Sequence, residues 1–341
     1  MKQQRFGIGI LILCSVFLIA LLLNLALGSV IIPLKELGKL FLGSSTSSSF
    51  EYIMWDYRFP KALAAIAIGG SLGVSGLLMQ TFFRNPLAGP FVLGISSGAS
   101  LGVALLFFGS GLLFGLESYQ SISRTGVIIA SSIGSGLVFS AIFTIALRVK
   151  NTMGLLIIGL MFGSFTTAIV TVLSTFSSAE ILQRFVFWTY GNLGNLKFQE
   201  LQLMTIFILI ALGCCVMIIK ALNSLLLGEN YAQSMGIPVR QTRFIILFAT
   251  CLLTGASTAF AGPIGFVGLA VPHVVRLLLP TSEHRILLPA VFIMGGCLLL
   301  LCDTLAQLPG LEYSLPINGV TSMVGAPLLI WLILRKRKIE L

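Results

Sequence analysis

The sequence is poor in charged residues, since aspartate, glutamate, lysine and arginine together make up only 9% of its 341 residues. Soluble domains carry about a quarter of their residues as charged side chains, so this composition excludes an ordinary soluble domain. Hydrophobic residues account for 57% of the chain instead, and the mean hydropathy is +1.03. The composition indicates one integral membrane domain and leaves no room for a soluble catalytic domain.

Acidic residues and histidine are scarce as well, with 11 Asp and Glu residues and 2 His. These are too few acids for a metal cluster, and the sequence has no phosphate-binding loop, no HExxH motif and no GxSxG motif. The six cysteines lie in apolar runs without metal-ligand spacing, which is typical of packing residues. We therefore expect no catalytic site, no metal site and no cofactor, so that any energy source is a partner or an ion gradient.

Long apolar runs are what the sequence has in abundance. A bilayer crossing needs about 20 apolar residues, and runs near that length recur along the chain. The first run is too long for a cleaved signal peptide and should remain as a span. We expect an all-α polytopic membrane protein with ten transmembrane helices, at about residues 6–28, 60–82, 91–108, 125–147, 153–176, 201–219, 244–261, 265–279, 286–308 and 319–334.

The basic residues give these spans an orientation. With ten crossings both termini lie on one side of the membrane, and most lysines and arginines fall on that side. The positive-inside rule makes it the cytoplasm. The net charge of +10 is then a topology signal, and no nucleic-acid partner is expected. If residues 265–279 did not cross, the basic cluster at 335–338 would face outward, against the rule.

Two Gly/Pro-rich turns interrupt the apolar pattern. The first follows the second span, and the Ala-Gly-Pro at its centre recurs after the seventh span. Broken backbone of this kind is tolerated in a membrane only where protein or a water-filled cavity covers it. Ala-Gly-Pro is also a common turn tripeptide, so an accidental match is the alternative. The residues that define the two turns are Arg84, Asn85, Pro86, Gly89, Pro90, Gly262 and Pro263.

The two turns lead into spans three and eight, five crossings apart, and so enter from opposite sides of the membrane. This odd offset predicts an inverted repeat of spans 2–5 and 7–10, with a transport pathway near the interface of the halves. The single integral-membrane domain, residues 1–341, then divides into four parts. These are a first span and external loop at 1–57, a first repeat at 58–176, a surface helix, sixth span and coupling segment at 177–243, and a second repeat at 244–341.

Two polar segments are candidate docking sites. Residues 228–238, between spans six and seven, form a short amphipathic helix followed by Gly and Pro stop signals. This helix could dock another protein on the cytoplasmic side, although a solvated linker fits the pattern equally well. At the outer mouth of span two, Arg58 and Lys61 would either steer an acidic external partner or simply anchor the helix at the interface.

Three ionisable residues, His273, Arg276 and Asp303, fall inside predicted spans. Such groups are costly in a membrane and usually face the bundle interior, where each needs a partner. For His273 a structural role is favoured over a proton relay or a metal ligand. For Asp303 an interhelical or helix-end hydrogen bond is favoured over a coupling-ion site.

The chain resembles the FecCD family, the permease subunits of type II ABC importers that take up iron-siderophores, haem or cobalamin. The resemblance covers most of the sequence, and RNPLA together with GFVGLxxPHxxR, which includes Pro272, His273 and Arg276, is its most specific part. The matching segments are RFPK at 58–61, SGLLMQTFFRNPLAGPFVLGISSGA at 75–99, GENYAQSMG at 228–236, AGPIGFVGLAVPHVVRLLL at 261–279, EHRILLPA at 283–290, DTLAQ at 303–307 and GAP at 325–327.

The resemblance implies a homodimer in the bacterial cytoplasmic (inner) membrane, with both termini cytoplasmic. Its partners would be two cytoplasmic ABC ATPase subunits and an external substrate-binding protein, and the permease itself would be no enzyme. Iron chelates of the siderophore or haem class are the expected cargo, with cobalamin as the alternative. An ion-coupled secondary transporter would also use inverted repeats but needs buried acids, and a membrane scaffold would leave the backbone breaks unexplained.

The resemblance also implies roles for individual residues. The ATPase-coupling residues would be Glu229, Ala232, Gly236, His284 and Arg285. The binding-protein docking residues would be Arg58 and Lys61, and the residues near the inner gate would be Asn151, Thr152 and Met153.

The chain departs from the family pattern at three positions. Lys61 replaces an arginine and so loses the bidentate fork of a guanidinium. Gln307 stands where an arginine is frequent, which removes one docking contact. Asn318 stands where glycine is common, so the start of the last span should bend differently.

Overall fold

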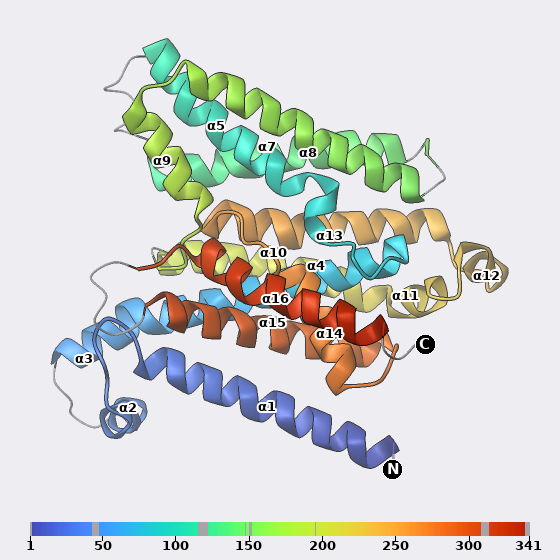
Figure 1. The fold of residues 1–341 in the computed structure, drawn as a ribbon, viewed down its shortest axis with the longest axis horizontal. Coiled ribbons are helices and arrows are strands. Elements are labelled where there is room, and N and C mark those ends of the chain that lie inside the picture. Colours follow the sequence, from blue (N-terminus) through green and yellow to red (C-terminus); the bar gives the residue numbers. More distant parts are fainter. Residues whose placement is uncertain are drawn as a thin grey trace. The chain divides into compact units, whose positions relative to one another are not determined.

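The computed structural model describes residues 2–42, 48–114, 122–146, 148–149, 152–194, 196–307 and 314–337. All regular structure within these ranges is helical (Figure 1). In the described part of the chain, seven helical stretches are long and apolar enough to cross a membrane. They are α1 (Lys2–Ala26), the run from α3 (Ser48–Tyr52) through η1 (Ile53–Arg58) to α4 (Phe59–Phe83), α7 (Arg124–Ala146), α8 (Thr152–Thr175), α10 (Phe198–Met217), α13 (Val239–Ala261) and α15 (His284–Ala306).

Three further apolar helices stand where the sequence predicts the remaining spans: α5 (Ile95–Phe114), α14 (Val267–Leu278) and α16 (Ile317–Arg337). The all-α polytopic fold is thereby confirmed, while the count of ten crossings stays a prediction. With 12 residues, α14 is only about 18 Å long, which is shorter than the hydrocarbon core of a bilayer. With 20 residues, α5 is shorter than its neighbours α4 and α7, which have 25 and 23 residues.

Short helices connect the long ones. The predicted surface helix is α9 (Ala179–Thr189), which exposes Phe187 and is followed by the exposed Tyr190. The others are α2 (Leu34–Phe41), the 3₁₀ turn η2 (Pro90–Leu93), α11 (Ile219–Leu225) and α12 (Glu229–Ser234).

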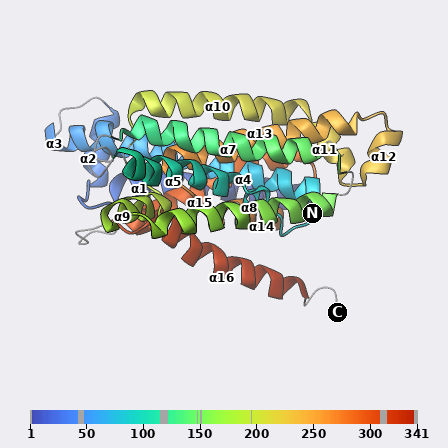
Figure 2. The ribbon, with the colours of Figure 1, turned by 90° about the horizontal axis from the view of Figure 1, so that it is seen from above.

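The chain packs as two compact units, which we describe separately. Unit 1 comprises Met1–Val74, Asn192–Thr205 and Gly265–Leu341, and unit 2 comprises Ser75–Gly191 and Ile206–Ile264. In unit 1, α15 packs against α1, α14 and α16, and in unit 2, α7 packs against α5, α8 and α13 (Figures 1 and 2). The units do not follow the predicted repeats, since α13 packs with the helices of the first half. The division at 58–176 and 244–341 remains a prediction.

Glycines set the closest helix contacts in each unit. In unit 1, a Cβ atom at Gly69 of α4 would overlap the carbonyl oxygen of Gly295 of α15, and the reverse is also true. In unit 2, a Cβ at Gly134 of α7 would overlap the carbonyl oxygen of Gly98 of α5. Small residues let helix backbones approach in this way, and this close packing is typical of membrane helices.

Candidate functional site

The first Gly/Pro turn is a well-defined break between α4 and α5. Arg84 has a positive φ of 49°, and the Asn85 side chain accepts a hydrogen bond from the Leu87 backbone N–H at 2.9 Å. The chain then forms η2 and passes through Gly94 at φ 68° into α5. A 3₁₀ turn followed by a left-handed glycine redirects the chain within a few residues. The structure therefore places the predicted backbone break at its predicted position.

The second turn also contains a glycine with a positive φ, although its ψ is extended. Gly262 has a φ of 78° and lies so close to Trp188 that a Cβ would stand 2.6 Å from the Trp188 carbonyl oxygen. Only glycine fits such a position without strain. In unit 1, the Asn318 side chain accepts a hydrogen bond from the Gly265 N–H at 2.9 Å. The asparagine that departs from the family pattern thus satisfies a backbone donor of this break.

The predicted coupling segment forms α12, at the end of α13 in unit 2 (Figures 1 and 2). Gly228 at φ 112° precedes the helix, and Gly236 at φ 78° ends it. Ala232 is completely buried. The carboxylate of Glu229 is held by Arg243 of α13, whose Nη2 lies 2.6 Å from Oε1. Glu229, Ala232 and Gly236 therefore lie in or next to the same short helix, but Glu229 is ion-paired, Ala232 is buried and Gly236 ends the helix.

The neighbouring loop leads into α15 in unit 1. His284, the first residue of α15, is completely buried and lies within electrostatic range of Arg276, whereas Arg285 is exposed. His273 and Arg276 are both half-buried on α14, which also contains the buried Pro272. Of the two residues expected to couple to an ATPase here, only Arg285 presents its side chain to the surroundings of this chain.

Arg58 caps the C-terminus of α1. Its Nη1 donates a hydrogen bond to the carbonyl oxygen of Leu25 at 2.5 Å, and its Nη2 donates to that of Val30. The last carbonyls of a helix lack partners within the helix and carry partial negative charge, so a guanidinium stabilises them. The predicted docking cation therefore already has a structural role.

Lys61 is engaged as well. Its ammonium nitrogen lies 2.9 Å from Oδ1 of Asp303, and the two side chains are only 17% and 4% exposed. Asn24 donates to Oδ2 of Asp303 at 3.0 Å, and Gln307 donates to the same carboxylate at 3.0 Å. These residues form a buried cluster, the Asp303 cluster, that joins α1, α4 and α15. The interhelical bonding predicted for Asp303 is what the structure shows.

Two of the three predicted gate residues, Thr152 and Met153, lie at the start of α8. Asn151 lies outside the described residues, Thr152 is the first residue of the helix, and Met153 is 53% exposed. Further along, α8 continues to expose large apolar side chains, among them Leu160, Phe165 and Val172. A long helix with an exposed apolar face needs lipid or another protein surface against it.

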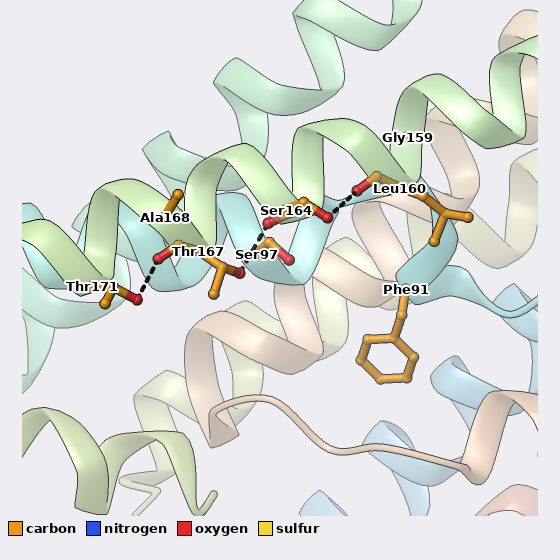
Figure 3. A pocket seen from close by; sticks show the side chains of 9 residues that line it. Phe91, Ser97, Gly159, Leu160, Ser164, Thr167, Ala168 and Thr171 are labelled. Carbon is orange, nitrogen blue, oxygen red and sulfur yellow. Dashed lines mark hydrogen bonds between the residues drawn. The ribbon is translucent and has the colours of Figure 1, made fainter.

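A pocket of about 550 Å³ lies in unit 2 against α8 (Figure 3). Its lining residues are Phe91 from η2, Ser97 from α5, and Gly159, Leu160, Gly163, Ser164, Thr167, Ala168 and Thr171 from α8. A second pocket of about 330 Å³ shares Phe91, Ser97 and Thr167 with it. Among the described residues, none that lines either pocket is charged.

Three hydroxyl groups of the pocket are already used as donors. Ser164, Thr167 and Thr171 each donate to the carbonyl oxygen one turn earlier, at 3.1, 2.9 and 3.0 Å (Figure 3). A hydroxyl that donates in this way keeps oxygen lone pairs for an external donor. The pocket therefore offers weak hydrogen-bond acceptors and apolar contacts but no strong ligand.

The sequence contains signals for the α8 pocket and for the Asp303 cluster that our sequence analysis did not use. Hydroxyl residues at 164, 167 and 171 recur at helical spacing beside the close pair Gly159 and Gly163, which indicates one polar, tightly packed face. Asn24 is a polar residue near the end of a span, which favours a polar partner inside the bundle. Pairing it with Asp303 needs the tertiary structure.

Comparison with known proteins places this geometry in context. The sequence profile of the FecCD transport family matches residues 16–335. The Vitamin B12 import system permease protein BtuC of Klebsiella pneumoniae is 34% identical over 337 residues, which cover 98% of this chain and 95% of that protein. The Hemin transport system permease protein HmuU of Yersinia pestis is 36% identical over 327 residues, which cover 94% and 95%.

A solved structure shares the fold as well. It is an inward-facing conformation of a proposed metal-chelate type ABC transporter, with a TM-score of 0.81 and 25% sequence identity. The match covers 96% of this chain and 99% of that one. The likeness in fold therefore extends along nearly the whole length of both chains.

Proposed function

The chain belongs to the FecCD transport family, and on that premise we propose that it forms the pathway of an ATP-driven importer for iron chelates of the siderophore or haem class. It is a permease of the type II ABC importer class, and its relatives are transport subunits rather than enzymes. Within this class it works as a gate for the cargo and performs no chemistry on it. The alternative cargo is cobalamin, which the similarity to BtuC keeps open.

The observation that carries this proposal is the uncharged pocket on α8. Its size, about 550 Å³, is within the range of ordinary small-molecule sites, and α8 exposes an apolar face beside it. A conducting site has to bind its cargo weakly enough to release it. Hydroxyl acceptors and apolar walls meet that requirement for a bulky chelate, whereas a cluster of charged ligands would retain the metal.

The partners follow from the same premise. Two copies of the chain would place their α8 faces around a shared axis, and this would cover the exposed apolar side chains. Two cytoplasmic ABC ATPases would drive the gate through α12, and an external substrate-binding protein would deliver the chelate. The complex would lie in the bacterial inner membrane with both termini in the cytoplasm.

An ion-coupled secondary transporter fits less well. Among the residues that the structure describes, Asp303 is the one acidic side chain that is buried. Its carboxylate already accepts from Lys61, Asn24 and Gln307, so it has no free position for a coupling ion. The energy source is therefore better assigned to nucleotide hydrolysis by a partner.

Reconstitution tests the proposed function directly. The chain, copurified with its ATPase and inserted into vesicles, is expected to import a ferric siderophore or haemin only when ATP and the binding protein are supplied. Uptake of the two iron chelates and of cobalamin is measured side by side. Uptake driven by an ion gradient without ATP would contradict the proposal, and uptake of cobalamin alone would reassign the cargo.

A pocket variant tests the pathway. Thr167→Phe fills the shared part of the two pockets and is expected to reduce uptake at least tenfold, because the added ring occupies the space of the cargo. Val172→Phe is the matched control, since Val172 is also exposed on α8 but does not line either pocket. Both variants should insert normally. Equal uptake in the two variants would remove the pocket from the pathway.

A further inference from the structure

We propose that Glu229 is a positioning residue that fixes α12 to α13 through Arg243, and that the ATPase instead contacts an apolar stripe on the exposed side of α12. This inference rests on the proposed function, because it concerns how an ATPase would move the permease. It differs from the role that family resemblance implies for Glu229, namely direct contact with the ATPase.

The first step is the geometry of the ion pair. The Nε and Nη2 atoms of Arg243 lie 3.1 and 2.6 Å from Oε1 of Glu229, and Nη2 also donates to Oε2. The two side chains are 17% and 30% exposed, so the pair is partly shielded from water. A guanidinium that contacts both carboxylate oxygens fixes orientation as well as distance. A carboxylate held in this way is poorly placed to bind a second cation from a partner.

The second step is the set of contacts that hold the rest of α12. The Ile237 N–H donates to the Ala232 carbonyl at 3.0 Å, and the Gly236 N–H donates to that of Gln233 at 2.9 Å. Both bonds close the C-terminal turn of α12, and residues 235–238 then link α12 to the start of α13. The ion pair joins the N-terminus of α12 to the next turn of α13. With both ends tied, displacement of α12 has to displace α13.

The third step is the surface that α12 leaves free. Leu227, Tyr231 and Met235 are 64%, 48% and 57% exposed. Tyr231 in α12 and Met235 at its C-terminal end are four residues apart and so lie on one side of the helix, whereas Ala232 is buried. Leu227 precedes the helix, next to Gly228. An apolar and aromatic stripe of this kind fits a hydrophobic groove on a partner protein. The FecCD resemblance implies that α12 is the ATPase-coupling segment on the cytoplasmic side, so we assign the ATPase subunit as the partner.

A charge swap separates the two roles of Glu229. Glu229→Gln and Arg243→Gln should retain the bound ATPase but lower substrate-stimulated ATP hydrolysis about fivefold or more, the low end of usual coupling strengths. The double variant Glu229→Arg/Arg243→Glu should return stimulation to within about twofold of wild type, because the swapped pair can still form. If the double variant stays uncoupled while wild type is coupled, Glu229 acts on the partner and the inference is wrong.

Variants of the stripe complete the test. Tyr231→Ala and Met235→Ala leave the ion pair intact and should reduce copurification of the ATPase, whereas Glu229→Gln should not. Retention of the ATPase by both stripe variants would overturn the assigned contact surface. Failure of the proposed function would look different, since the wild-type permease would then neither retain an ATPase nor stimulate one.

Discussion

Replacing Asp303 with leucine is expected to lower the free energy of unfolding by about 3–5 kcal/mol, because Lys61 would keep a mostly buried charge without its counter-charge. The pair is shielded, with side-chain exposures of 17% for Lys61 and 4% for Asp303. The substitution also leaves Asn24 and Gln307 without their shared acceptor. The measurement is the unfolding midpoint of the purified protein in detergent, by heat or by denaturant.

Two controls make this prediction specific. The double variant Lys61→Met/Asp303→Leu removes both charges and should recover most of the lost stability, since apolar replacement of a buried pair is often neutral. Glu36→Gln breaks the exposed pair between Glu36 and Lys39, 2.8 Å apart, and should cost no more than about 1 kcal/mol. A cost for Asp303→Leu no larger than that of Glu36→Gln would show that the cluster is not a stabilising element.

The same double variant bears on docking. If Lys61 also serves an external binding protein, the stable double variant should bind that protein more weakly and with less dependence on salt. Unchanged docking would mean that the cation of Lys61 is used only within its own chain. Sequence resemblance cannot separate the roles of Lys61 in stability and in docking. Measuring both properties on this one double variant separates them.

Gly134→Ala is expected to destabilise the protein by about 3 kcal/mol, at the upper end of the usual cost of overpacking. A Cβ at this position overlaps the carbonyl oxygen of Gly98 and lies 2.9 Å from the backbone nitrogen of Gly102, so α5 and α7 would have to separate. Backbone atoms cannot move aside as a flexible side chain can. The effect is measured as the shift in the unfolding midpoint.

Gly136→Ala on the same helix provides the matched control. Nothing lies within 4 Å of a Cβ built at Gly136, so alanine meets no obstacle there. Alanine is favoured over glycine inside a helix by about 0.5–1 kcal/mol, which predicts a small gain. The two substitutions are chemically identical, two residues apart, and should act in opposite directions. Equal effects would contradict the close packing of α5 on α7.

Hydropathy predicts the long helices well, because their length and apolarity are properties of the sequence alone. The fifth predicted span, at 153–176, corresponds to α8 at Thr152–Thr175. Hydropathy fails to predict the start of α5, because the apolar run continues through Pro90–Leu93 although the backbone there is a 3₁₀ turn. Apolarity does not reveal this change in hydrogen bonding, which is marked instead by Gly89 and Pro90.

The partners of charged residues were harder to predict from the sequence than the helices. The sequence shows where Glu229 and Lys61 stand but not what lies opposite them, and resemblance supplied partner proteins for both. In the structure, Arg243 lies opposite Glu229, and Asp303 lies opposite Lys61. Lys61 and Asp303 are distant in sequence, and Glu229 and Arg243, 14 residues apart, lie on different helices, so no periodic pattern records either contact. The polar face of α8 that lines the pocket, by contrast, is indicated by the helical spacing of its hydroxyl residues.

The order of synthesis gives the Asp303 cluster a further meaning. Asn24 is made early and remains in the growing chain, yet its hydrogen-bond acceptor Asp303 follows 279 residues later. The C-terminus of α1 likewise waits for Arg58. The C-terminus of α1 can be capped once Arg58 has been made, but the Asn24 amide finds its acceptors only after α15 has been made. If synthesis stops before α15, α1 lacks the helix against which it mainly packs.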